Sequence, residues 1–228
     1  AMYHMCQLSG VPVGTAFIVI TGDSKPHAWW PHAALPVASG NRHVGGRSYV
    51  LPMQALRFYE EVTVRDPQPA VPWARKRAEL YWRGDSTGME QGQSLQRPRF
   101  VHALRRRGHD VAFYKWPLDS IGPGDEAGWA CTPGPCLYGI ERNQSGHVTA
   151  LRYVADNSTV ITHDDIKPFV PMSASLQYKW LLCLEGNSMA TAITWMLASD
   201  SVVVMPPPTL EGWTLEGRLQ PWVHYVPL

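Results

Sequence analysis

The chain has 228 residues, of which 45% are apolar, 17% charged and 11% aromatic, and its formal net charge is +1. This length allows one large domain or two small ones, with enough apolar residues to bury a real core. The balanced charge excludes the basic field that dominates nucleic-acid binding, and the short, interrupted apolar runs predict no integral membrane segment.

The N-terminal third contains one clear predicted element, a buried strand at 15–21 made of β-branched and apolar residues. This strand ends in a Gly-Asp-Ser-Lys-Pro turn at 22–26, and Trp29 and Trp30 follow in an aromatic loop. Residues 36–72 are rich in Pro, Gly and Arg, which predicts loops with little regular structure.

The middle of the chain predicts a strand, a helix and a second strand. The helix has apolar residues at helical spacing, arginines in its last turn and a glycine behind it, and these last two features favour a helix C-terminus. The predicted elements are a short basic helix or turn at 73–80, a strand at 80–83, the helix at 97–107 before Gly108, a strand at 111–114 and a loop-like region at 117–147.

Near the C-terminus, two apolar strands at 180–184 and 201–205 flank a helical pattern of apolar residues at 189–197. Asn187 or Ser188 is available as the N-cap of this helix. A strand, a helix and a strand in this order form a βαβ unit, which predicts a parallel sheet.

The turn at 185–190, between the first of these strands and the helix, is a candidate phosphate site. Ligands of parallel sheets bind at the carboxyl ends of the strands, beside helix N-termini whose N–H groups attract anions. Every βαβ unit has such a turn, so the spacing by itself is a weak indication.

The cysteine pattern predicts no metal site, because no Cys-x-x-Cys pair occurs and the histidines are not spaced to complete a zinc site. Cys131 and Cys136 flank a Thr-Pro-Gly-Pro turn, and they either form a small disulfide or remain free thiols. Cys183 lies in an apolar run and is predicted to be a buried hydrophobic residue.

Five motifs in a fixed order resemble glycosyltransferase family 90, the CAP10-type enzymes that include the protein O-glucosyltransferases. Two of them are a strand with an Asp-containing turn at 17–23 and the Tyr-Trp-Arg-Gly motif at 81–84. The others are Tyr-Lys-Trp-Leu-Leu-Cys-Leu-Glu-Gly-Asn at 178–187, Leu-Ala-Ser-Asp-Ser-Val-Val at 197–203 and Leu-Gln-Pro-Trp-Val-His-Tyr-Val-Pro at 219–227.

The resemblance implies an α/β protein with a GT-B-like fold, in which two Rossmann-like domains face a cleft. Residues 1–75 would form an incomplete N-terminal acceptor-side domain, and residues 76–228 the C-terminal donor-binding domain without its final helices. We therefore expect either a fragment or a pared-down member of the family whose sheets a partner chain completes.

The same resemblance implies an inverting, metal-independent glycosyltransferase. It would move a hexose or pentose, glucose or xylose, from a UDP-sugar to a hydroxyl of a glycan or protein acceptor. No cofactor is expected besides the donor substrate, and no nucleic-acid partner. A bacterial member would act in the cytoplasm or at the cytoplasmic membrane face, and a eukaryotic one in the secretory lumen.

The family match assigns the general base to Asp23, with Asp85 as the alternative. Inversion requires a base that takes the proton of the acceptor hydroxyl as it attacks the anomeric carbon. From the residues alone, a structural role of Asp23 in capping the Gly-Asp-Ser turn is favoured over the base role.

The donor-binding prediction centres on Arg83, which matches a donor-binding arginine of the family and would stabilise the leaving UDP. Many members carry a Ser-x-Arg pair in the donor loop, which this chain lacks, so Arg77 or Lys179 are expected to assist. Glu211 either accepts hydrogen bonds from ribose hydroxyls or is a solvated helix residue. The predicted donor loop consists of Glu185, Gly186, Asn187, Ser188, Met189 and Ala190.

The ten tryptophans favour an aromatic core or stacking on flat ligands such as sugars. Trp29 and Trp30 are the predicted acceptor-stacking residues. Three of the predicted framework tryptophans are Trp82, Trp180 and Trp195; the fourth, Trp222, lies in a predicted core strand at 222–226.

Two further interpretations stay open at this point. The arginines at 97, 99 and 105–107 form either a solvated helix face or contacts to an acidic acceptor. The whole chain is either a glycosyltransferase, a non-catalytic carbohydrate- or partner-binding derivative of the same fold, or a generic nucleotide-binding α/β protein.

Overall fold

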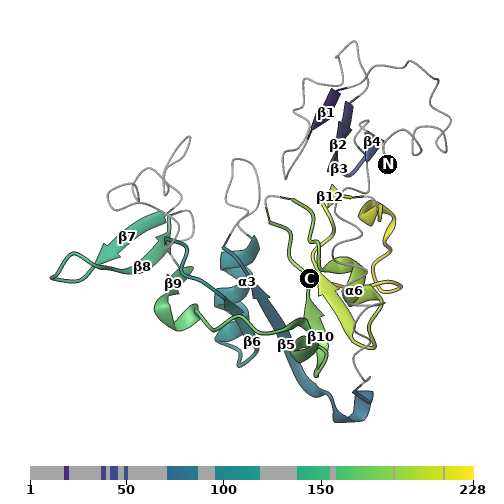
Figure 1. The fold of residues 1–228 in the computed structure, drawn as a ribbon. Helices are drawn as coiled ribbons and strands as arrows, with labels where there is room; N and C mark the ends of the chain where they lie inside the picture. The colour runs from purple at the N-terminus through teal and green to yellow at the C-terminus, as the bar shows by residue number, and fades with distance from the viewer. Residues whose placement is uncertain are drawn as a thin grey trace.

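The centre of the computed structural model is a five-stranded parallel sheet with the strand order β13-β11-β10-β5-β6 (Figure 1). Its strands are β5 (Arg77–Gly84), β6 (Asp110–Phe113), β10 (Tyr178–Leu182), β11 (Val202–Met205) and β13 (Val226–Pro227). The structure describes residues 18–20, 37–39, 42–45, 49–50, 71–86, 96–118, 138–154, 158–186, 188–212 and 214–228.

Two crossover connections leave the middle of this sheet in opposite directions. Helix α3 (Gln96–Arg105) connects β5 to β6, and helix α6 (Ile193–Leu197) connects β10 to β11. Because parallel crossovers are almost always right-handed, opposite directions put the two helices on opposite faces of the sheet. The boundary between β5 and β10 is therefore the point at which the winding direction of the sheet changes.

Two hydrophobic clusters confirm this arrangement. Trp82, Leu182 and Val204 pack with Val101 and Leu104 of α3. The residues one position earlier, Tyr81, Leu181 and Val203, pack in the second cluster with Ile193 and Met196 of α6. Since neighbouring strand residues point to opposite faces, both faces of the sheet are covered. The predicted α/β class and the parallel βαβ unit are confirmed.

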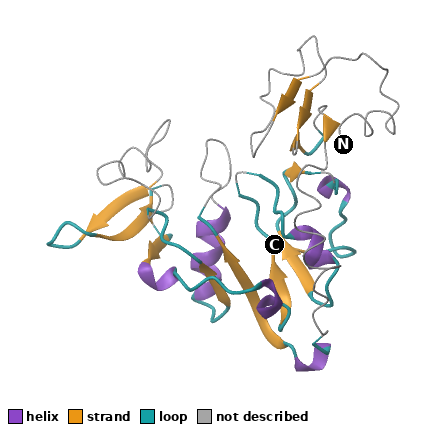
Figure 2. Cartoon of the chain, viewed as in Figure 1, coloured by secondary structure: helices purple, strands orange, loops and turns teal. Residues whose placement is uncertain are grey.

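Smaller elements surround the central sheet (Figure 2). They are a parallel sheet of β1 (Ile18–Ile20), β2 (Val37–Ser39) and β4 (Tyr49–Val50); an antiparallel pair of β3 (Arg42–His43) and β12 (Leu210–Glu211); an antiparallel sheet of β7 (Tyr138–Arg142), β8 (Val148–Tyr153) and β9 (Val160–Thr162); the short helix α5 (Met172–Ser175); and 3₁₀ turns at Trp73–Arg75, His163–Asp165 and Glu216–Arg218.

Several element predictions need correction. The strand predicted at 15–21 is present over Ile18–Ile20, but the loops predicted at 36–72 and 117–147 contain short strands. These strands are two to five residues long, which is too short to leave a clear periodic signal.

The C-terminal helix starts later than predicted. Helix α6 begins at Ile193 with Ala192 as its N-cap, so neither Asn187 nor Ser188 caps it. Instead, the Ser188 carbonyl accepts a 3.0 Å hydrogen bond from the Gly186 N–H, and the turn folds on itself. The candidate phosphate turn is therefore not the N-terminus of a helix.

The strand predicted at 222–226 is wrong except at its last residue. The carbonyl of Gln220 accepts hydrogen bonds from the N–H groups of Val223 and His224, which closes a compact turn. Trp222 lies in this turn with a φ of 66° and is 76% exposed, so it is not a framework residue. Trp82 and Trp195 are buried, as predicted.

Candidate functional site

A cleft of about 330 Å³ opens where the winding direction of the sheet changes, at the carboxyl ends of β5 and β10. Open α/β sheets bind their ligands at this position. The cleft is lined by residues 81–85 at the end of β5 and by 182–184 at the end of β10. The other lining residues are 169–172, Ser175, Ala190, Thr191, Ala192, Trp195, Met196, Arg97 and Tyr114.

Arg97 joins the two strand ends at the floor of this cleft. Its Nη1 donates to the backbone carbonyl of Asp85 at 2.8 Å, and its Nη2 donates to the carbonyl of Leu184 at 3.2 Å. The guanidinium also lies 5.7 Å from the centre of the Trp82 ring. Burial lowers the pKa of Arg97, although the nearby Asp85 acts in the opposite direction.

The prediction of a solvated face for all the arginines of this helix is therefore wrong for Arg97. The sequence spacing could have predicted the buried position of Arg97, because Arg97, Val101 and Leu104 have the i, i+4, i+7 spacing of one helix face. Val101 and Leu104 are buried on this face. Arg99 and Arg106, by contrast, are exposed as predicted.

Gly186 allows Arg97 to reach this position. A Cβ atom added at residue 186 would lie 2.7 Å from Nη2 of Arg97, closer than two such atoms approach in proteins. The donor-loop glycine predicted from the sequence is thus placed directly against a cation.

Arg83 lines the same cleft, but most of its hydrogen bonds point away from it. Nη2 donates to Oδ1 of Asp110 at 2.7 Å, and Nη1 donates to the backbone carbonyls of Asp110 and Trp82, both at 2.9 Å. Its guanidinium lies 4.9 Å from the centre of the Tyr81 ring. Arg83 is therefore held mainly by its own sheet.

The carboxylate of Asp110 accepts hydrogen bonds from three side chains in separate parts of the chain. The donors are Arg83, Nζ of Lys167 at 2.5 Å and the hydroxyl of Tyr178 at 2.5 Å. Burial alone would raise the pKa of Asp110, but these hydrogen bonds outweigh burial and hold the pKa well below its ordinary value. Burial and the bond to Asp110 raise the pKa of Tyr178 to about 12.

Asp85, the alternative general base, also lines the cleft. Its Oδ2 lies 2.9 Å from Nζ of Lys115 and accepts a 3.3 Å hydrogen bond from the hydroxyl of Tyr114. Its Oδ1 accepts a 2.7 Å bond from the N–H of Ser86. Burial, followed by the charge of Asp85, raises the pKa of Tyr114.

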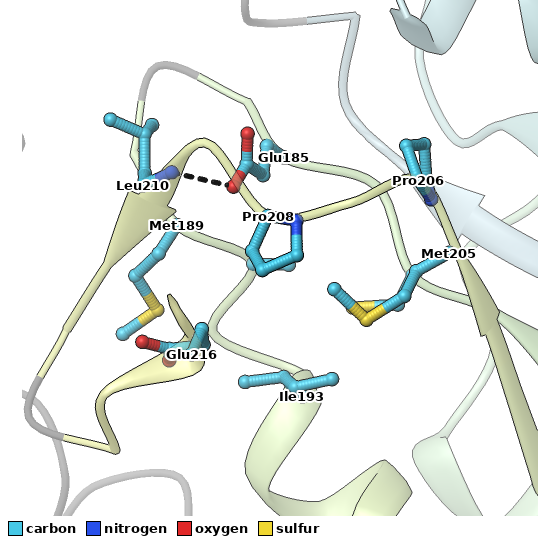
Figure 3. A pocket seen from close by; sticks show the side chains of 10 residues that line it. Glu185, Met189, Ile193, Met205, Pro206, Pro208, Leu210 and Glu216 are labelled. Carbon is cyan, nitrogen blue, oxygen red and sulfur yellow. Dashed lines mark hydrogen bonds between the residues drawn. The ribbon is translucent and has the colours of Figure 1, made fainter. Parts of the chain in front are cut away.

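Glu185 and Met189 of the predicted donor loop border a second region, and Ala190 borders both that region and the cleft. Oε1 of Glu185 accepts hydrogen bonds from the N–H groups of Thr209 and Leu210 at 2.8 and 2.9 Å, so this carboxylate ties the loop to β12 (Figure 3). Met189, Ala190 and Glu185 border a second pocket of about 10 Å³, which has room for about one water molecule.

Glu211 lies in β12 rather than on a helix, and it is buried. Its Oε1 accepts a 2.8 Å hydrogen bond from Nε of Arg42, across the β3–β12 pair. The alternative of a solvated helix glutamate is therefore wrong, and the ribose contact stays a prediction.

Several predicted residues lie outside the described part of the chain: Asp23, Trp29, Trp30, Asn187, Cys131 and Cys136. Cys183 is buried as predicted, and burial raises the pKa of its thiol to about 12. Within the described ranges, no group of three or more His, Cys, Asp or Glu side chains is arranged to hold a metal ion. No helix among the described residues has the length and hydropathy needed to cross a bilayer.

Comparisons with known proteins add two partial likenesses. O-glucosyltransferase LpsA of Dichelobacter nodosus is 48% identical over 62 residues, which is 27% of this chain and 20% of LpsA. Uncharacterized protein 027R of Frog virus 3 (isolate Goorha) is 29% identical over 170 residues, 72% of this chain and 15% of that protein. The chain thus spans a fifth or less of either relative. No protein-family model matches it.

Proposed function

We propose that this chain carries the donor-binding cleft of a glycosyltransferase that moves a hexose or pentose from a UDP-sugar to a hydroxyl of a glycan or protein. The partial likeness to an O-glucosyltransferase supports the reaction class. The observation that carries the proposal is the position of Arg97, whose guanidinium bridges the carboxyl ends of β5 and β10 beside Gly186. The proposal includes a family 90 GT-B arrangement, in which residues 76–228 bind the donor.

The chemistry requires a cation at this position. As the bond between the anomeric carbon and the diphosphate breaks, negative charge develops on the leaving UDP, and a fixed positive group stabilises it. Arg97 supplies this charge in a partly buried site, where an ion pair is stronger than in water. Arg83 also lines the cleft, and its ion pair with Asp110 holds it against β6.

The acceptor hydroxyl oxygen attacks the anomeric carbon while the bond to UDP breaks, and its proton passes to a carboxylate. Asp85 lines the cleft and is the general-base candidate among the described residues that do so. Asp23 stays the prediction that the family resemblance makes for this role.

The test is UDP binding together with UDP release from UDP-glucose or UDP-xylose in the presence of candidate acceptors. Arg97→Gln is expected to weaken UDP binding by about tenfold or more, since it removes a charge-assisted contact. Arg97→Lys, which keeps the charge, should retain part of the affinity. Arg99→Gln on the exposed face of the same helix is the matched control and should bind as the wild type does. The proposal fails if UDP and UDP-sugars neither bind nor shift the melting temperature of the wild type.

One observation favours a non-catalytic sugar-binding derivative as the second candidate. The donor loop has Ala190, Thr191 and Ala192 where many family members carry a Ser-x-Arg pair, so it supplies no cation of its own. This candidate predicts UDP-sugar binding without UDP release, whereas the leading proposal predicts both.

A further inference from the structure

We propose that Phe169, at the rim of the cleft, is the residue on which a neutral sugar ring stacks. This inference rests on the proposed function, and it assigns a role to a side chain outside the motifs of the sequence analysis. Phe169 is 72% exposed although it lines the cleft. Its aromatic partner is Tyr114, with ring centres 5.8 Å apart in a T-shaped contact, which leaves a ring face open.

The backbone on both sides of Phe169 is held in place. The N–H of Lys167 donates to the carbonyl of Phe113 at 2.8 Å, and its Nζ contacts Asp110 at 2.5 Å. Beyond Phe169, Val170 and Met172 pack against the hydrophobic cluster on the α6 side of the sheet. An exposed aromatic ring on a fixed segment needs little reordering when a ligand stacks on it.

The groups around Phe169 select the kind of ring. Tyr114, which contacts Phe169, donates its hydroxyl to Asp85 at 3.3 Å. An aromatic face accepts the slightly positive C–H face of a sugar, and a nearby carboxylate accepts its hydroxyls. Phe169 and Asp85 thus form a wall for the uncharged part of the substrates.

The sugar ring belongs either to the donor or to the acceptor, and three probes separate these sources. Binding of UDP, of UDP-glucose and of methyl β-glucoside is measured by calorimetry and by saturation-transfer NMR. Two variants are compared with the wild type: Phe169→Ala removes the aromatic face, and Phe169→Trp keeps one. Trp222→Ala is the matched control, because Trp222 is also a highly exposed aromatic residue but does not line the cleft.

Phe169→Ala is expected to leave UDP affinity unchanged and to weaken one sugar-bearing probe by about 3- to 10-fold. If Phe169→Ala loses affinity for UDP-glucose, the sugar that stacks on Phe169 is that of the donor. If it loses affinity for methyl β-glucoside, the stacking sugar is that of an acceptor. Phe169→Trp should restore that affinity, and Trp222→Ala should change none.

Two results would overturn the inference. One is an equal loss for UDP itself, which would assign the ring to a nucleobase; the other is unchanged binding of all three probes in Phe169→Ala. If the wild type binds neither UDP nor UDP-glucose, the proposed function fails instead. Methyl β-glucoside alone then tests the role of Phe169. Weaker binding of this glucoside by Phe169→Ala than by the wild type supports sugar stacking, and unchanged binding, or no binding by the wild type, overturns the inference.

Discussion

Arg97 and Gly186 touch across the floor of the cleft, where a Cβ at residue 186 would lie 2.7 Å from Nη2 of the arginine. The contact joins α3 to the loop after β10, two segments that lie far apart in the sequence. Gly186 is not among the glycines with a positive φ, so its backbone conformation does not require glycine. A side chain at residue 186 would instead collide with the guanidinium of Arg97.

Gly186→Ala is therefore expected to displace Arg97 and to weaken UDP binding by about 5- to 20-fold, with about 1 kcal/mol lost from the free energy of unfolding. Gly139→Ala is the control, since the nearest atom to a Cβ there lies 3.8 Å away. Calorimetric titration with UDP and thermal unfolding measure both effects. Equal UDP affinity in Gly186→Ala and the wild type would contradict the assignment of Arg97.

Asp110→Asn should destabilise the fold, because it leaves the cations of Arg83 and Lys167 beside a neutral side chain. We expect a loss of about 2–4 kcal/mol in the free energy of unfolding, measured by urea denaturation. Glu141→Gln is the control, since its 2.7 Å ion pair with Arg152 is exposed to solvent and should contribute less than about 1 kcal/mol. Similar losses in the two variants would show that the Asp110 network contributes little.

The raised pKa of Tyr178 predicts a loss of stability at alkaline pH. In the unfolded chain a tyrosine loses its proton near pH 10, whereas in the folded chain the pKa is about 12. The folded state thus binds more protons between these values, so the stability from this group is complete below pH 10 and declines from pH 10 to 12. Denaturation series at pH 9 to 12 should show this decline, and Tyr178→Phe should reduce its slope. An unchanged slope in the variant would contradict the prediction.

Ser201 ties the amino ends of three strands together, since its hydroxyl accepts from Nζ of Lys76 at 2.7 Å and donates to the carbonyl of Tyr178 at 2.8 Å. Ser201→Ala leaves a buried ammonium without this acceptor and should cost about 1–3 kcal/mol of unfolding free energy. Ser145→Ala in the exposed β7–β8 turn should change stability by less than about 0.5 kcal/mol. A drop of the same size in both would reject a special role for Ser201.

The elements with a strong local pattern could be predicted from the sequence. Helix α3 ends before Gly108, whose φ of 83° suits glycine, and the parallel pairing of β10 and β11 follows from the βαβ order. The spacing of Arg97 from Val101 and Leu104 also placed it on the buried face of α3. The charge of the side chain, however, favoured the interpretation that it is exposed to solvent. Arg83 shows the opposite case, because its partner Asp110 starts the neighbouring strand and nothing local indicates that contact.

By itself, the sequence determined the α/β class, the buried apolar strands and the motifs that indicate sugar transfer, because these depend on residue type and on spacing along a single segment. Only the tertiary structure decided the strand order, the location of the cleft at the carboxyl ends of β5 and β10, and the presence of Arg97 and Phe169 in its lining. It also decided that the turn around Trp222 stays at the surface. These features arise from contacts between segments far apart in the chain, which local hydrophobic periodicity does not encode.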